Sequence, residues 1–152
     1  MSIIKKVRRW LSPRSQLLER LAETAADAEI LAANLSRHTA LCHYVTLRSG
    51  LAELTIAETA QANSIRQLLL EHGIGPKVAL VPSHDGSSNW ERLRNDLALQ
   101  VKIHRALQAQ FSEWSAIDPQ IAGRLRESAI AQDRRIEQLR DLTLKCDPQA
   151  LD

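Results

Sequence analysis

The sequence predicts an all-α protein, one four-helix bundle preceded by a short amphipathic segment. Apolar residues recur every three or four positions through four long segments, which is the spacing of helices with one buried face. The five glycines and five prolines lie mainly between these segments, so the helices are expected to run long. Only five residues are aromatic, which leaves Leu, Ile and Ala to form the core. A chain of 152 residues can bury such a core as one domain, without disulfides or metals.

The chain opens with a basic amphipathic leader, residues 1–12. A helix over residues 2–11 would have one apolar and one basic face. The apolar residues are Ile3, Ile4, Val7, Trp10 and Leu11, and the basic residues are Lys5, Lys6, Arg8 and Arg9. Residues 1–14 carry five basic residues and no acidic one, so the remainder, with 15 basic and 18 acidic residues, has a net charge of −3. This mildly acidic body argues against nucleic-acid binding.

The first two helices are predicted from their caps and stripes. Ser12 and Pro13 are typical of an N-cap and first turn, and the helix is predicted over residues 13–37. A connection over residues 38–46 follows, in which His38 and His43 are expected to face solvent. The second helix runs to His72, before Gly73. The two apolar stripes are Leu18, Leu21, Ala25, Ala28, Ala32 and Leu35, then Leu47, Leu51, Leu54, Glu58, Gln61, Ile65 and Leu68.

The last two helices follow the one long loop, residues 73–87. Ser88 and Glu91 match the capping box that opens a third helix. Asp118 and Pro119 cap and start the fourth, which ends near Lys145 and leaves residues 147–152 as a tail after a bundle of residues 13–146. The stripes are Trp90, Leu93, Leu97, Gln100, His104, Leu107, Phe111 and Trp114, then Ala122, Leu125, Ala129, Gln132, Ile136 and Leu139.

Loop lengths predict two antiparallel hairpins, because short loops join antiparallel neighbours. The loop of residues 73–87 can span about 50 Å when extended, whereas the second helix is about 35 Å long. The loop is therefore long enough to cross the whole bundle. Both helix orders, up-down-up-down and up-down-down-up, remain open.

Polar residues interrupt three of the four apolar stripes near their middles. These residues are Glu58 and Gln61, Gln100 and His104, and Gln132 with Arg135 beside its stripe. Each interruption lies three to four turns from a helix end, so the six side chains can meet at one level. Buried polar groups are costly unless they satisfy one another. The sequence therefore predicts a mutual hydrogen-bond network, or the remains of a functional site.

These residues carry a family resemblance. Glu58-Thr-Ala-Gln61 and Gln132-Asp-Arg-Arg135 lie where the ferritin-like superfamily of four-helix bundles places Glu-x-x-His. The segment Asn89-Trp-Glu-Arg-Leu-Arg-Asn-Asp-Leu97 is similar to bacterial ferritin-like proteins of unassigned function. The resemblance covers residues 13–145 and implies a di-metal site, built from one Glu on each of two helices and Glu-x-x-His on each of the other two.

The chain departs from that ligand pattern. Glu58 matches a ligand, but Gln61 stands in the first His position, and Gln132 and Arg135 stand in the second Glu and His positions. Gln100 stands near the Glu of the third helix. Amide and guanidinium groups are poor ligands for iron or manganese. We therefore predict a degenerate site without metal, in which Arg135 forms a salt bridge with Glu58.

Three functions stay open, and the first is favoured. It is a non-catalytic interaction, structural or accessory protein, with no cofactor and no catalytic residue, whose partner is another protein or a second copy of the chain. The second is a metal-binding ferritin-like protein for iron handling or for peroxide or oxygen chemistry, with Glu58 and His104 as iron or manganese ligands, helped by Glu23 or Glu29. The third is a bundle that binds a small ligand in the polar cluster.

The leader also indicates where in the cell the protein is located. Lys5, Lys6, Arg8, Arg9 and Trp10 suit contact with a protein patch or with an anionic membrane, or the leader packs on its own bundle. No apolar run has the length of a secretion signal or a membrane span. The two isolated cysteines form no disulfide framework and fit reduced thiols. We expect a cytoplasmic protein, peripheral to a membrane or a larger assembly where its leader binds.

Overall fold

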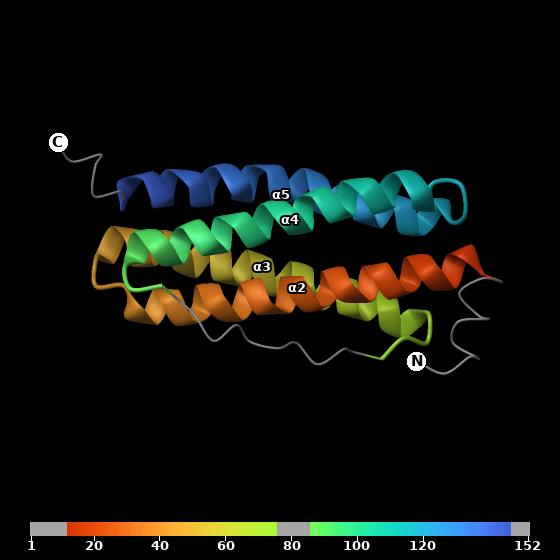
Figure 1. The fold of residues 1–152 in the computed structure, drawn as a ribbon, viewed down its shortest axis with the longest axis horizontal. Helices are drawn as coiled ribbons and strands as arrows, with labels where there is room; N and C mark the ends of the chain where they lie inside the picture. Colours follow the sequence, from red (N-terminus) through yellow and green to blue (C-terminus); the bar gives the residue numbers. More distant parts are fainter. Residues whose placement is uncertain (1–11, 76–85, 147–152) are drawn as a thin grey trace.

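The computed structural model describes residues 12–75 and 86–146. They form four long helices, α2 (Pro13–Leu41), α3 (Val45–Glu71), α4 (Asn89–Trp114) and α5 (Pro119–Lys145), as Figure 1 shows. The predicted all-α four-helix bundle is confirmed. The leader, apart from Ser12, and the tail of residues 147–152 lie outside the described residues.

Three of the helices start at side-chain caps, each of which the sequence predicted. Ser12 and Ser88 accept hydrogen bonds from the backbone N–H groups three residues on, at 3.2 Å in both cases. Asp118 accepts from the N–H groups of residues 120 and 121. Such caps satisfy backbone donors that have no partner within the helix. At the start of α4, the Glu91 carboxylate also accepts hydrogen bonds from the backbone N–H and the Oγ of Ser87.

The connection between the first two helices is shorter than predicted. α2 continues to Leu41 rather than to residue 37, and α3 starts at Val45, so that only residues 42–44 join them. No glycine or proline occurs between residues 38 and 44 to stop the helix earlier. His38 lies in the last turn of α2 and is buried, which corrects its predicted exposure, whereas His43 is exposed as predicted.

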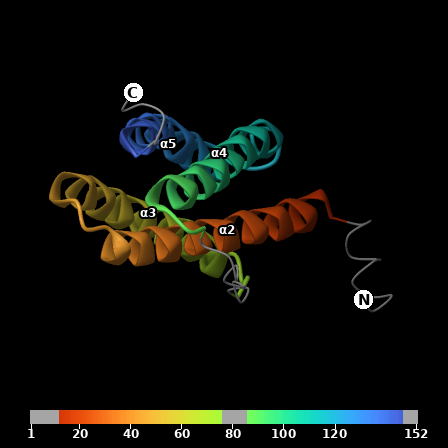
Figure 2. The ribbon, with the colours of Figure 1, turned by 60° about the vertical axis from the view of Figure 1, so that its left-hand side comes forward.

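The helices run up-down-down-up. Arg14 at the start of α2 contacts both His72, just after α3, and Asp118, just before α5, at 3.0 and 3.3 Å. At the other end of the bundle, His38 of α2 contacts Asp96 near the start of α4. α3 and α4 are therefore parallel, which decides between the two orders that the sequence left open. Figure 2 shows the α2–α3 and α4–α5 hairpins as two stacked layers.

The core confirms the predicted stripes of α2, α3 and α5, all of whose residues are buried. The face of α4 is rotated from the predicted one. The predicted core residues Trp90, Leu97, His104 and Phe111 are only partly buried. The buried positions beside Leu93, Gln100, Leu107 and Trp114 are instead Asp96, Ile103 and Gln110. The predicted face was wrong because residues three and four positions apart lie on nearly the same side of a helix, so spacing alone does not separate two adjacent faces.

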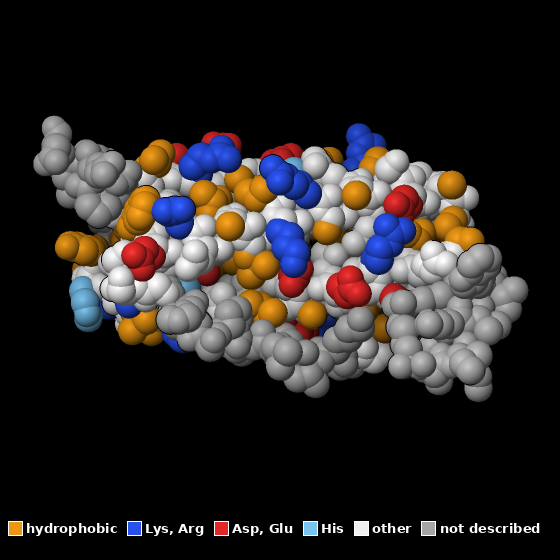
Figure 3. Space-filling view, viewed as in Figure 1, with side chains coloured by type: hydrophobic (Ala, Val, Ile, Leu, Met, Phe, Trp, Pro, Cys, Tyr) orange, Lys and Arg blue, Asp and Glu red, His pale blue; other side chains and the backbone are white. Residues whose placement is uncertain are grey.

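Charged side chains on the surface are paired across the seams between helices. These pairs are Arg20–Glu113, Asp27–Lys102, Glu29–Arg66, Glu71–Arg124 and His104–Asp133. On the face in Figure 3, basic and acidic side chains are correspondingly interspersed rather than segregated. Pairs of this kind stabilise little individually, and each of them joins two neighbouring helices. None of the helices in the described part of the chain is apolar enough over sufficient length to cross a membrane.

Candidate functional site

The Glu58 carboxylate is the centre of the polar cluster. Its side chain is completely buried. It accepts hydrogen bonds from Nε2 of Gln100 at 3.0 Å and from Nε2 of Gln132 at 3.4 Å, and Nε of Arg135 lies 2.8 Å from its Oε1. The donors come from α4 and α5, so this one carboxylate joins α3 to these two helices. A buried charge requires such partners, because it has lost its hydration.

The Arg135 guanidinium forms the other half of the cluster. Besides Glu58, it donates through Nη2 to Oε1 of Gln61 and to Oε1 of Gln132. These contacts fix the orientation of the glutamine amides, because an ionised carboxylate only accepts and a guanidinium only donates. Gln132 bridges both charges, with its Nε2 directed to Glu58 and its Oε1 directed to Arg135.

Five of the six residues predicted to meet are joined by these bonds, and the Glu58–Arg135 salt bridge is present in the structure. The sixth, His104, lies one turn beyond Gln100 but at the edge of the bundle. Its Nε2 lies 2.8 Å from Oδ1 of Asp133, whose side chain is exposed. The rotated face of α4 explains this difference, since it points Ile103 rather than His104 into the core.

The acidic residues of α2 do not reach the cluster. Glu23 is exposed, and Glu29 pairs with Arg66 at the surface between α2 and α3. Their predicted role as additional metal ligands is therefore not supported by their positions. Within residues 12–75 and 86–146, no three His, Cys, Asp or Glu side chains come close enough to hold a metal ion. The cluster contains one carboxylate, three amides and a guanidinium, which do not fit a di-iron or di-manganese centre.

A second buried pair was missed by sequence reasoning. Nδ1 of His38 lies 2.5 Å from Oδ2 of Asp96, and the two side chains are 3% and 0% exposed. The pair joins the last turn of α2 to the second turn of α4. A signal was available, because His38 follows Leu35 by three residues and so continues the apolar stripe of α2.

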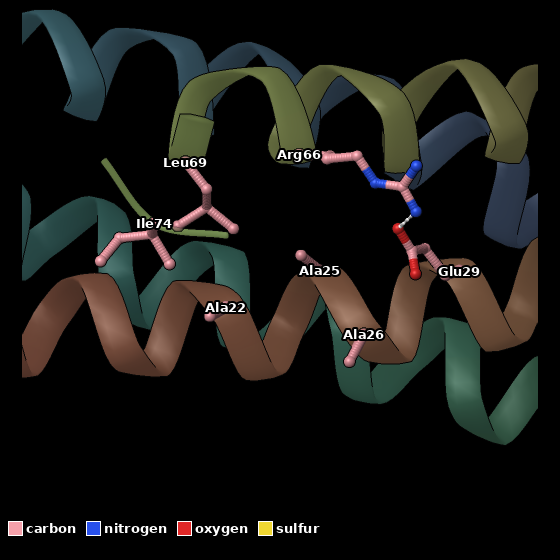
Figure 4. A pocket seen from close by; sticks show the side chains of 7 residues that line it. All are labelled: Ala22, Ala25, Ala26, Glu29, Arg66, Leu69 and Ile74. Atoms are coloured by element: carbon pink, nitrogen blue, oxygen red, sulfur yellow. Dashed lines mark hydrogen bonds and ion pairs between the residues drawn. The ribbon is translucent and has the colours of Figure 1, made fainter. Parts of the chain in front are cut away.

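Three hollows in the surface of the bundle are not lined by residues of the polar cluster. The smallest of them, between α2 and α3, has a volume of about 10 Å³, room for one water molecule at most. Figure 4 shows small and apolar side chains around it, with the Arg66–Glu29 pair at its edge. Two larger hollows, of about 280 and 340 Å³, are open grooves over the α4–α5 and α2–α3 seams. The linings of all three exclude Glu58 and Arg135.

Among residues 12–75 and 86–146, three groups outside the cluster have shifted pKa values. The backbone N–H of Ile121 and the Arg14 side chain lower the pKa of Asp118 below its usual 3.8. Hydrogen bonds from Ser87 lower the pKa of Glu91 below its usual 4.5. Burial raises the pKa of the Cys146 thiol above 9.0, and Cys42 adds to that rise. Cys42 and Cys146 are not joined in a disulfide, and the raised pKa disfavours thiolate chemistry at Cys146.

Comparison with known proteins supports the architecture. No protein-family model and no curated protein sequence matches the chain. Among solved structures, the crystal structure of an archaeal dps-homologue from Halobacterium salinarum matches with a TM-score of 0.75 and 18% sequence identity, over 84% of this chain and 79% of that chain. A likeness at this identity establishes the fold. The chain therefore has the ferritin-like four-helix-bundle fold that its sequence resemblance predicted.

Proposed function

We propose that this chain is a non-catalytic ferritin-like bundle that acts through its surface, as an interaction, structural or accessory protein. The observation that carries the proposal is the Arg135 guanidinium in the polar cluster, 2.8 Å from the buried carboxylate of Glu58. In this proposal the pair takes the place of a metal centre, and the core is purely structural.

The donor chemistry supports this choice over the metal-binding alternative. A di-iron or di-manganese centre needs about four carboxylates, whereas the cluster offers Glu58 alone. The other oxygen ligands are neutral amides, and Arg135 adds a positive charge that repels a metal cation. The hydrogen-bond donors around Glu58 also compete with any metal for its lone pairs.

The surface supports an interaction role. Several large apolar side chains among the described residues are exposed. Four of them lie at the end of the bundle where α2 and α5 end and α3 begins, namely Leu41, Tyr44, Val45 and Leu144. This end of the bundle is the proposed contact surface, because exposed apolar patches mark protein contacts. A second copy of the chain or another protein is the proposed partner.

The leader belongs to the same proposal, although it lies outside the described residues. Its basic residues, Lys5, Lys6, Arg8 and Arg9, with Trp10, would bind a protein partner or an anionic membrane surface. The protein would then be cytoplasmic and peripheral to the surface or assembly that the leader contacts.

Metal content tests the proposal directly. The full chain is expressed without an affinity tag, grown with added iron and manganese, purified without chelators and measured by elemental analysis. We expect well below one iron or manganese per chain. About two metals per chain, lost in a Glu58→Ala variant that keeps its helical spectrum, would establish the metal-binding alternative instead.

A further inference from the structure

We infer that the polar cluster is an oxygen-lined cation cage, whose resident cation is the Arg135 guanidinium, and that the cage accepts a free guanidinium-class cation when this side chain is removed. The inference rests on the proposed function, because it requires that no metal occupies the core. It assigns a ligand class to the cluster, which the proposed function alone does not.

Convergence of oxygen atoms on one group is the first argument. Oε1 of Glu58, Oε1 of Gln61 and Oε1 of Gln132 all accept hydrogen bonds from Arg135. They come from two helices, α3 and α5, and Gln132 also donates to Glu58, so part of the arrangement does not depend on the arginine. Gln100 holds Glu58 from α4 through its Nε2, so the carboxylate is fixed from a third helix as well.

Charge balance is the second argument. Glu58 is completely buried, and Arg135 supplies the positive charge paired with it. Removal of the arginine leaves a buried carboxylate without a counter-charge, which is strongly unfavourable. A soluble cation that enters the cage would restore both the charge balance and the hydrogen bonds.

Access is the third argument. The Arg135 side chain is 13% exposed, whereas that of Glu58 is not exposed. Truncation at Arg135 therefore removes the group that separates the carboxylate from solvent. The space left has the shape of the removed side chain, and its acceptors are already oriented toward planar N–H donors. Methylguanidinium reproduces the lost head group.

The test is thermal unfolding of the Arg135→Ala variant of the full chain, followed by circular dichroism with and without methylguanidinium chloride. Sodium chloride of equal ionic strength is the reference. We expect the variant's Tm to rise by about 3–6 °C when the cation is tenfold above its dissociation constant. The wild type and Arg134→Ala, which alters an exposed neighbouring arginine, should show no rise.

The double variant Glu58→Gln/Arg135→Ala separates the cage from general salt effects. It should not respond to methylguanidinium, because the anionic wall is gone. Equal responses of the double and single variants, or none in the single variant, would overturn the inference. If Arg135→Ala does not fold alone, refolding from urea with methylguanidinium should restore its helical signal, and failure to do so would overturn it equally. Metal in the wild type would contradict the proposed function, whereas absent rescue in a metal-free protein would contradict only the cage.

Discussion

Glu58 and Arg135, at the centre of the bundle, carry opposite charges, and the burial of each charge depends on the presence of the other. Glu58→Gln removes the negative partner and leaves Arg135 largely buried with a positive charge. We expect a loss of about 3 kcal/mol in the free energy of unfolding, at the low end for broken buried pairs because Arg135 is partly exposed. Urea denaturation measures it.

The energetic coupling between Glu58 and Arg135 is measured with two more variants, Arg135→Met and the double variant Glu58→Gln/Arg135→Met. The double variant should be less destabilised than the sum of the single ones by about 1–3 kcal/mol. Additive losses would show that the two side chains do not interact in the folded protein.

Asp118 gives the bundle a defined response to acid. Its folded pKa is lowered, mainly by the Ile121 N–H, so its contribution to stability is present above its unfolded pKa and is lost as the pH falls through the lower folded value. Asp118→Asn keeps a cap but does not titrate. Between pH 6 and pH 2, the urea midpoint of this variant should fall less than that of the wild type, and equal slopes would contradict the assignment.

Between whole helices, the His38–Asp96 pair joins α2 to α4 near one end of the bundle. His38→Leu removes one partner of a buried hydrogen bond, so we expect a loss of about 2–3 kcal/mol, measured by urea denaturation. His43→Leu is the matched control, since His43 is exposed and its replacement should have little effect. Similar results for both variants would mean that the pair does not hold these helices together.

The helices themselves were largely predictable, because caps and periodicity act within one segment. Ser12, Ser88 and Asp118 marked three starts correctly, and the stripes of α2, α3 and α5 were right. The stripe of α4 was partly wrong, since Leu97 and Ile103 offer competing apolar faces and only the neighbouring helices decide between them. Because of this ambiguity, Asp96 was not predicted to be buried, and His104 was predicted to lie in the core.

Across the whole molecule, helix order could not be predicted, because a loop long enough to cross the bundle can also fold back. Contacts between distant residues decided it, such as those of Arg14 with His72 and Asp118. The polar cluster was more accessible to prediction, since polar residues within apolar stripes need one another. Its arrangement around Glu58 required the structure, because sequence spacing does not show which amide faces which charge.

The leader gives a prediction for the molecule as a whole. Replacement of Lys5, Lys6, Arg8 and Arg9 by Ser removes four positive charges. Under the proposed function, association should be lost while the thermal melt stays unchanged, because electrostatic binding contributes about 1 kcal/mol per basic residue at an anionic surface.

Sedimentation velocity of the full chain, and co-sedimentation with anionic vesicles, measure this association. Replacement of Arg48, Arg105, Arg126 and Arg134 by Ser is the control with an equal change of charge, since these four residues are exposed. If the leader variant associates as the wild type does, the leader is not the contact.

The up-down-down-up order also sets the distance between the start of α2 and the end of α5. α2 and α5 begin at the same end, as the Arg14–Asp118 contact shows, so α5 ends at the opposite end from the start of α2. With 27 residues in α5, the separation along the axis is about 40 Å. Two fluorophores attached at the start of α2 and the end of α5 would be held at nearly fixed spacing, and energy transfer between them would report on bending of the bundle when a partner binds.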